Sequence, residues 1–414
     1  MHYKKILETF NKLKRSKYKN KEFDISVHNL HQTILNEEKS INYNKLKSII
    51  AHTILLFLSL ISVLIAKIKN VKKVNYFIVT DNLSIDIKSK NIIKNLNQGN
   101  YLNLIRNNNF IKSIYIFFKY KNVVFYQSIF IFYDIRNSLS NKKIKDKFLA
   151  IHDKNKYKVF LLKKIFTFLK IKKLITIDDY REMQIFIKVC KDTDVKSTGY
   201  QHARFSEHKI ALSYDCYDNY IVWTKYFKKR LLKINKNYKN KIFINNFRNF
   251  SFKKNKPQKK NNNIIFFCED YMNENKVINF LKKINDIKEF KLHVKIKDSL
   301  IMSKLLNNFL EANNITVIKN KNLDDAVKEF KPVIFLASQS NVLIEATLYD
   351  AIPIMLDTDN DYSYDLINEN LAFKINLHNN LRIKLLNIYK NQKFKNKVFK
   401  IVWNFKNEKI KNIF

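Results

Sequence analysis

Residues 195–202 read Val-Lys-Ser-Thr-Gly-Tyr-Gln-His, and we predict a strand over 195–201 that ends in polar side chains. The apolar run 174–177 precedes it and ends in Asp178 and Asp179, and residues 219–223 (Asn-Tyr-Ile-Val-Trp) form a further run. Short buried strands separated by helices of about 10–15 residues are typical of parallel βαβ units. These runs therefore predict an open α/β sheet with polar groups at its strand ends.

Glycine is almost absent from this chain, which holds only two in 414 residues. An average protein carries about 7% glycine, so roughly thirty would be expected. We expect Asn and Asp to fill the turns instead, since both tolerate the left-handed backbone region at modest cost. Gly199, which remains within a predicted strand, is expected where no side chain fits.

The charge is high, at +42 with a pI near 9.9. Lys, Asn, Ile, Phe and Tyr are in excess, which indicates an A+T-rich genome because their codons are A/T-rich. The lysines are scattered and no helix-turn-helix, zinc-finger, RRM or KH pattern occurs, so we expect no nucleic-acid partner. The charge favours phosphorylated substrates and an anionic membrane surface. Three distant cysteines indicate neither a disulfide framework nor a metal site and favour a reducing cytoplasm: Cys190, Cys216 and Cys268.

The domain organisation follows from shifts in pattern along the chain. A helical, basic extension is predicted first, then two α/β domains joined by a polar, lysine-rich linker that contains Pro257. Strands are expected at 74–81 in the first domain and at 264–268, 292–296, 315–318, 333–337 and 352–356 in the second. The predicted boundaries are 1–73 (extension), 74–250 (first domain), 251–263 (linker), 264–400 (second domain) and 401–414 (tail or helix).

The extension contains an uncharged stretch, 48–66, bracketed by lysines, which reaches the lower limit of length for a membrane span. Its small and weakly polar residues fall on one helical face: Ser48, His52, Ser59, Ser62 and Ala66. Three interpretations remain open. The helix lies on a membrane, crosses it, or is buried against the domain.

Polar residues also follow the predicted strand 333–337 in the second domain. Ser338, Ser340 and Asn341 precede an apolar helix, and Ser and Asn are favoured N-caps that offer a phosphate site. Glu345 lies in the first turns of that helix, where its carboxylate can accept hydrogen bonds from ribose hydroxyls. Each feature alone also has a purely structural interpretation as a cap or a solvated side chain.

Taken together, the strand end Gly199-Tyr200-Gln201-His202 and the later Ser338, Ser340, Glu345-Ala346 and Pro353 resemble bacterial GT-B glycosyltransferases of surface and capsular polysaccharide synthesis. The resemblance covers about 74–400 and is sharpest at 174–230 and 332–356. It implies two Rossmann-like domains facing a cleft, with the nucleotide-sugar donor on the second domain. Two departures are Val-Lys-Ile-Lys-Asp at 294–298, where many relatives have Lys-Pro-His-Pro, and Ala203 after the histidine.

The resemblance implies transfer of a sugar from a nucleotide-sugar to a glycan or lipid-linked acceptor at the cytoplasmic face of the inner membrane. It implies no cofactor and no metal, and the Asp357-Thr358-Asp359 pattern is interpreted as a structural loop. His202 is the expected base, with Asp178, Asp179 and Glu182 as competitors. The expected donor contacts are Ser338, Ser340, Asn341, Glu345, Lys295 and Lys297, and the expected acceptor loop holds Gly199, Gln201, Arg204 and His208.

Other functions stay open at this point. A polyol-phosphate transferase of the teichoic-acid type and a sugar-nucleotide 2-epimerase share the two-domain fold. A non-catalytic membrane-associated scaffold and a membrane-tethered nucleic-acid binder are further alternatives. Binding of nucleotides distinguishes the enzymes from the scaffold. A nucleic-acid binder would bind DNA or RNA with an affinity that falls steeply as the salt concentration rises.

Overall fold

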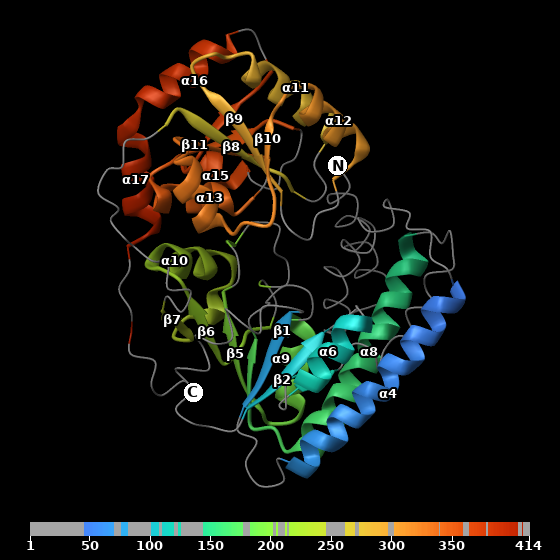
Figure 1. The fold of residues 1–414 in the computed structure, drawn as a ribbon. Helices are drawn as coiled ribbons and strands as arrows, with labels where there is room; N and C mark the ends of the chain where they lie inside the picture. The colour runs from blue at the N-terminus through green and yellow to red at the C-terminus, as the bar shows by residue number, and fades with distance from the viewer. Residues whose placement is uncertain are drawn as a thin grey trace.

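The computed structural model describes most of the chain beyond the first 44 residues. The described residues are 45–69, 76–81, 101–106, 110–119, 123–125, 144–176, 183–201, 204–205, 212, 215–245, 261–269, 273–296, 302–338, 340–358, 364–377, 380–404 and 408. They form two lobes, each built on its own sheet (Figure 1). Among these residues every strand pair is parallel, which confirms the predicted α/β architecture.

The first sheet has seven strands in the order β3-β2-β1-β4-β5-β6-β7. The strands are β1 (Tyr76–Asp81), β2 (Tyr101–Arg106), β3 (Val123–Phe125), β4 (Lys173–Thr176), β5 (Lys196–Tyr200), β6 (Asn219–Val222) and β7 (Ile242–Ile244). Its helices are α4 (Lys45–Lys69), α6 (Phe110–Lys119), α8 (Ile144–Leu169), α9 (Met183–Asp192) and α10 (Lys225–Ile234). The order reverses between β1 and β4, which is the Rossmann topology, and ligands of such sheets bind outside the strand ends at this reversal.

The second sheet repeats that order with six strands, β10-β9-β8-β11-β12-β13. The strands are β8 (Asn263–Phe267), β9 (Lys291–Lys295), β10 (Thr316–Ile318), β11 (Ile334–Ala337), β12 (Ile352–Leu356) and β13 (Phe373–Ile375). Its helices are α11 (Glu274–Asn285), α12 (Lys304–Ala312), α13 (Leu323–Phe330), α14 (Val342–Glu345), α15 (Tyr364–Asn368), α16 (Leu381–Lys390) and α17 (Gln392–Val402). Here the reversal lies between β8 and β11, whose register pairs Ile264 with Ile334.

Apolar side chains of the two lobes pack against one another. One cluster of buried apolar side chains contains residues of both, from Ile175 on β4 to Phe335 on β11. Helix α17 runs from the second lobe towards α10 of the first (Figure 1), and the indole rings of Trp223 and Trp403 stack with centroids 6.3 Å apart. The two Rossmann-like units are therefore held together by a continuous apolar contact.

Asn and Asp replace glycine in the turns, as the composition predicts. Nine described non-glycine residues have positive φ, of which five are Asn and two are Asp. Gly199 itself has ordinary φ, and its requirement is packing. A Cβ built there would lie 2.4 Å from Cδ2 of Tyr217 and 2.7 Å from Cδ2 of Tyr220, distances that real side chains do not reach. The prediction that no side chain fits at Gly199 is confirmed.

Helix α4 lies along the outside of the first lobe beside α8 (Figure 1) and contacts β3, α6 and α8. Ser59, Ser62 and Ala66 are buried, whereas the side chains of Ser48 and His52 lie outside the described set. The Ser62 hydroxyl accepts a hydrogen bond from the N–H of Phe125 on the edge strand β3, at 3.2 Å. The small, polar face of α4 therefore packs on the protein. No helix among the described residues has the length and hydropathy needed to cross a membrane.

Candidate functional site

The strand reversal of the second sheet places two polar side chains together. Glu269 follows β8, Ser338 follows β11, and the Ser338 hydroxyl donates a hydrogen bond of 2.7 Å to Oε2 of Glu269. Ser338 is completely buried. Ser338 was expected from the sequence and Glu269 was missed, although an acidic residue directly after a buried strand is the same signal that selected Asp178.

Ser340 and Asn341 directly precede the next helix, as predicted, but that helix is short, and the side chain of its N-cap residue Asn341 makes no capping hydrogen bond. Helix α14 has four residues, Val342–Glu345, and continues as a 3-10 turn over Ala346–Tyr349. The Ser340 hydroxyl accepts a hydrogen bond from the N–H of Val342 at 3.3 Å. Because so short a helix has a small macrodipole, hydroxyl and amide groups rather than the dipole would have to hold an anion here.

Glu345 lies at the end of α14 and is only 9% exposed. Its neighbours on the helix, Leu343 and Ile344, are buried as well. The interpretation of Glu345 as a solvated surface carboxylate is therefore excluded. A buried carboxylate needs hydrogen-bond donors around it, which suits either a structural role or a polar ligand.

Of the two lysines expected to contact phosphate, only Lys295 belongs to the described residues. Lys295 ends β9, and its Nζ donates a 2.5 Å hydrogen bond to the backbone oxygen of Lys321. Lys297 lies outside the described residues. Asp357 of the Asp-Thr-Asp pattern forms an ion pair with Lys374 at 2.9 Å. Among the described residues no cluster of three or more potential metal ligands occurs.

On the first sheet, Gln201 fixes the end of β5 against β6. Its side-chain oxygen accepts from the backbone N–H of Trp223 at 2.9 Å, and its backbone oxygen accepts from the Trp223 indole at 2.8 Å. Gln201 is completely buried. The polar strand end noted in the sequence therefore holds the exit of β5 rigidly. His202 and His208, which follow, lie outside the described residues, as do Asp178, Asp179 and Glu182 after β4.

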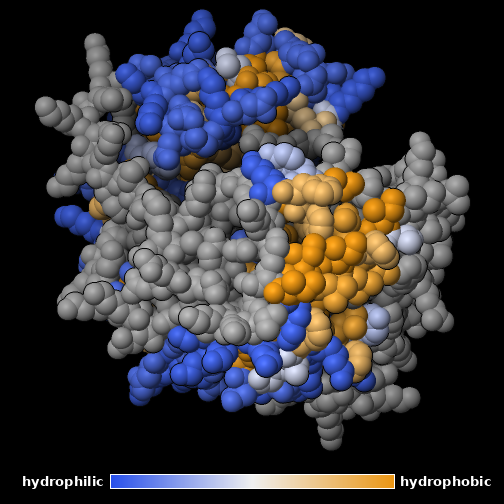
Figure 2. All heavy atoms as spheres, turned by 60° about the horizontal axis from the view of Figure 1, so that its bottom comes forward, coloured by the Kyte–Doolittle hydropathy of each residue, from blue (hydrophilic) through white to orange (hydrophobic). Residues whose placement is uncertain are grey.

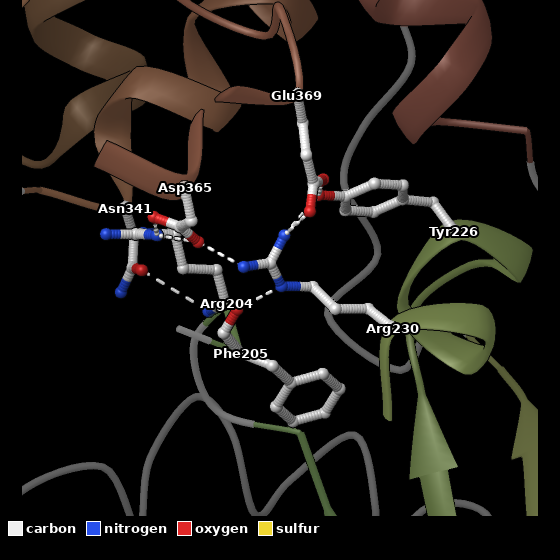
Figure 3. A network of polar contacts seen from close by, with 7 residues as sticks. All are labelled: Arg204, Phe205, Tyr226, Arg230, Asn341, Asp365 and Glu369. Carbon is white, nitrogen blue, oxygen red and sulfur yellow. Dashed lines mark hydrogen bonds and ion pairs between the residues drawn. The ribbon is translucent and has the colours of Figure 1, made fainter. Parts of the chain in front are cut away.

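Arg204, three residues beyond Gln201, reaches the second lobe (Figure 3). Its Nη1 lies 2.7 and 2.8 Å from the two carboxylate oxygens of Asp365 on α15. Both side chains are almost fully buried, with exposed fractions of 1% and 3%. A buried charge pair of this kind is retained only with good geometry, because removal of either partner leaves an uncompensated ion.

Arg230 on α10 extends the pair into a network of two cations and two carboxylates. It forms ion pairs with Asp365 and with Glu369, the latter at 2.5 Å, and donates to the backbone oxygen of Phe205. The Tyr226 hydroxyl donates to Glu369 at 2.6 Å and accepts from Arg230 at 3.0 Å. Burial raises the pKa of the Tyr226 hydroxyl, so it stays a neutral donor.

The arginine content of the sequence is a signal for this network that the motifs do not include. Only eight of the 78 cationic residues are arginines, and two of these eight are Arg204 and Arg230. Arginine offers planar, multiple donors that lysine lacks, so a scarce arginine is a candidate for a buried ion pair, although Arg382, whose side chain is 65% exposed, shows that scarcity alone does not identify one. Arginine scarcity could have been interpreted in the same way as glycine scarcity.

The two motifs chosen from the sequence, one on each domain, meet in the structure. The backbone N–H of Arg204 donates to Oδ1 of Asn341 at 3.3 Å, across 137 residues of chain (Figure 3). The segment after β5 thus lies against the start of α14.

No protein-family model matches the sequence, and no curated protein sequence is significantly similar to it. Solved structures do match in fold. A protein assigned as a UDP-N-acetylglucosamine 2-epimerase from Listeria monocytogenes has a TM-score of 0.51 at 12% identity over 79% of this chain and 90% of its own. S. aureus MnaA bound to UDP has a TM-score of 0.50 at 11% identity, and the match covers 78% of this chain and 90% of MnaA.

TcCGT1 in complex with UDP has a TM-score of 0.50 at 10% identity, covering 80% of this chain and 94% of that one. At such low identity the matches show the fold alone. The chain has the α/β fold of these two-domain proteins, in which two Rossmann-like units are joined, as the resemblance to GT-B enzymes implies.

Proposed function

We propose that this protein is a GT-B-type enzyme that uses a nucleotide-sugar donor and transfers the sugar to a hydroxyl of a glycan or lipid-linked acceptor. The observation that carries the proposal is the contact between Arg204 and Asn341, which joins the polar end of β5 to the start of α14. A transfer reaction requires the donor and the acceptor to meet, and this contact brings groups of the two Rossmann-like units together. The presence of UDP in two of the similar structures supports a nucleotide as the ligand.

On this proposal the donor binds outside β8 and β11, at the reversal of strand order. Glu269, Ser338 and Ser340 offer hydrogen-bonding groups there, Asn341 directly precedes the adjoining helix α14, and Glu345 ends it. The acceptor approaches from the first sheet, where His202 would accept the proton of its hydroxyl. Positive side chains near the second sheet, of which Lys295 and Lys297 are candidates, would stabilise the leaving phosphate.

A 2-epimerase acting on the same kind of nucleotide-sugar is the second candidate, favoured by the match to the assigned epimerase of Listeria monocytogenes at a TM-score of 0.51. The two reactions differ in their products. A transferase releases the nucleotide once for each sugar moved and requires an acceptor. An epimerase interconverts two nucleotide-sugars with no acceptor and returns the nucleotide still attached.

The first experiment is a thermal-shift panel of UDP, GDP, CDP, CMP and TDP on the full chain. A ligand present at a hundred times its Kd should stabilise the protein by about 2.7 kcal/mol, which is easily measured. Stabilisation by one nucleoside diphosphate supports a sugar donor, whereas stabilisation by CMP alone favours a polyol-phosphate transferase. An absence of any shift contradicts the proposal and favours a scaffold.

The second experiment separates transfer from epimerisation. The protein is incubated with the sugar ester of the nucleotide that stabilised it, and the products are followed by NMR. A second nucleotide-sugar formed without acceptor identifies an epimerase. Free nucleotide whose release depends on added glycan or lipid-linked acceptor identifies the transferase.

A further inference from the structure

Helix α4 is oriented with its large apolar side chains outward. Its small residues Ser59, Ser62 and Ala66 pack on the protein. The exposed side chains are the larger ones, with Phe57 66%, Leu64 54% and Ile68 75% exposed. This orientation is the reverse of an ordinary surface helix, which buries its large apolar residues and exposes its polar ones.

Exposed apolar side chains of α6 and α8 adjoin those of α4. Among the described residues, ten of the thirteen large apolar side chains that are exposed belong to these three helices, including Phe118 on α6 and Phe160 on α8. Figure 2 shows them gathered on one face of the molecule. Scattered single apolar residues are normal on a surface, but a contiguous area of this kind marks a site of interaction.

Among the described side chains of α4, α6 and α8 every charge is positive, and Asp146 and Asp153 of α8 belong to the part of that helix whose side chains lie outside the described set. No Asp or Glu occurs in α4, in α6 or in the stretch 155–169 of α8. Amines lie beside the exposed rings, with Nζ of Lys67 4.8 Å from the ring centre of Phe168 and Nζ of Lys119 4.9 Å from that of Tyr115. Nζ of Lys164 lies 5.7 Å from the Phe160 ring centre.

Apolar side chains bordered by lysines and interfacial tyrosines match a lipid surface. The apolar groups enter the acyl region, while aromatic rings and amines stay at the level of anionic headgroups. A second copy of the chain fits less well, because two such faces would bring lysines against lysines. We propose that the face formed by α4, α6 and α8 binds the surface of an anionic lipid bilayer, with α4 lying in the plane of the membrane.

This proposal does not depend on the reaction. Its first test is flotation of the full chain with vesicles of equal amounts of phosphatidylcholine and phosphatidylglycerol, and with vesicles of phosphatidylcholine alone. Wild type should float with the anionic vesicles. The double variant Phe57→Glu/Leu64→Glu should lose at least about tenfold in partition coefficient, since two apolar side chains no longer enter the bilayer. Both positions are exposed, so folding should be retained and is checked by circular dichroism.

The matched control is Leu305→Glu/Ile383→Glu, which changes two side chains of similar exposure, 53% and 56%, on α12 and α16 of the other lobe. It should float like wild type. Lys119→Gln/Lys164→Gln should weaken binding to anionic vesicles only. The proposal is overturned if wild type does not float, or if the patch variant and the control behave alike.

A fluorescent label on α4 shows directly whether lipid or protein covers the face formed by α4, α6 and α8. The three native cysteines are buried, so Phe57→Cys can be labelled selectively with an environment-sensitive fluorophore. The emission should be that of a water-exposed probe and shift to the blue when anionic vesicles are added. A probe that is already blue-shifted and does not respond to vesicles shows that the face is covered by another copy or by another part of the chain, and the proposal fails. Light scattering then tells those two apart.

Discussion

Arg204 and Asp365 form a buried ion pair between segments 161 residues apart, one four residues beyond strand β5 of the first sheet and one on helix α15 of the second lobe. Arg230 shares the same carboxylate, so Asp365 compensates two guanidinium groups. Asp365 therefore helps to hold Arg204 and Arg230 together, alongside the contacts of Arg204 with Asn341 and of Arg230 with Glu369. Loss of that carboxylate is expected to affect both stability and the relation between the two motifs.

Asp365→Asn should lower the free energy of unfolding by about 3–5 kcal/mol, because it leaves two buried cations with only the partly exposed Glu369. Urea denaturation followed by circular dichroism measures the change. Glu329→Gln is the control, since its ion pair with Lys321 is exposed and should contribute less than about 1 kcal/mol. Equal effects of the two substitutions would contradict the assigned role of Asp365.

Gly199→Ala should destabilise the protein by about 1–3 kcal/mol, as overpacking of a well-packed core does. The added methyl group would overlap the rings of Tyr217 and Tyr220, both completely buried. Lys196→Ala on the same strand is the control, because that side chain is exposed and should be nearly neutral. A Gly199→Ala protein as stable as wild type would show that the two rings can move aside.

The sequence predicted much of the fold because its strands are short, apolar and bounded by polar residues. Strands β5, β8, β11 and β12 lie within two residues of their predicted bounds. Other elements were not anticipated. Helix α8 was missed because lysines interrupt its apolar positions, and β3 and β7 are too short to show a pattern.

The candidate site was predicted only in part. Ser338 and Asn341 follow a recognisable strand and could be chosen from the sequence alone. Asp365 could not, because it lies on a five-residue helix without any motif, and only the folded chain brings it to Arg204. The predicted domain boundaries and the roles of His202, Asp179 and Glu182 stay predictions.

Ser338→Ala should weaken nucleotide affinity by about tenfold, since it removes the hydroxyl that lies at the strand reversal and holds Glu269. Isothermal titration with the stabilising nucleotide measures the change. Ser303→Ala is a matched control, because the Ser303 hydroxyl donates a similar 2.6 Å hydrogen bond to Glu274 elsewhere in the same lobe. If both variants bind alike, the donor site does not lie at Ser338.

Glu345→Gln tests the proposed ribose contact separately. It keeps the shape of the buried side chain and replaces one acceptor oxygen with an amide that donates, so a ribose hydroxyl that donates to Glu345 would lose its partner and nucleotide affinity should fall. Titration with the nucleoside diphosphate and with inorganic pyrophosphate, which has no ribose, distinguishes the contact. Equal loss for both ligands would place Glu345 near the phosphates instead.

His202→Ala should reduce transfer by about 10²–10⁴-fold and leave nucleotide affinity unchanged, because a general base acts on the acceptor hydroxyl and not on the donor. Single-turnover kinetics with a saturating acceptor provide the measurement. His378→Ala, which changes a histidine of the second domain that belongs to none of the motifs, is the control. Unchanged turnover in His202→Ala would transfer the base role to Asp178, Asp179 or Glu182, which are then substituted in turn.

His293 makes stability depend on pH. It is 2% exposed, its ring packs on Phe330 with centroids 4.5 Å apart, and neither ring nitrogen has a hydrogen-bond partner among the described residues. Burial, with a smaller contribution from the charge of Lys291, lowers the pKa of His293 to about 4. Between these two pKa values His293 is protonated in the unfolded chain, where its pKa is near 6.5, and neutral in the folded chain.

This stabilising contribution is complete above pH 6.5 and is lost as the pH falls towards 4. Between pH 7.5 and pH 5, where most carboxylates stay ionised, wild type should lose about 2 kcal/mol through His293. His293→Met fills the same space without titrating, so its free energy of unfolding should fall by about 2 kcal/mol less than that of wild type over the same pH interval. Urea denaturation at the two pH values measures both changes. Equal pH dependence in wild type and His293→Met would mean that the imidazole takes up its proton in the folded state.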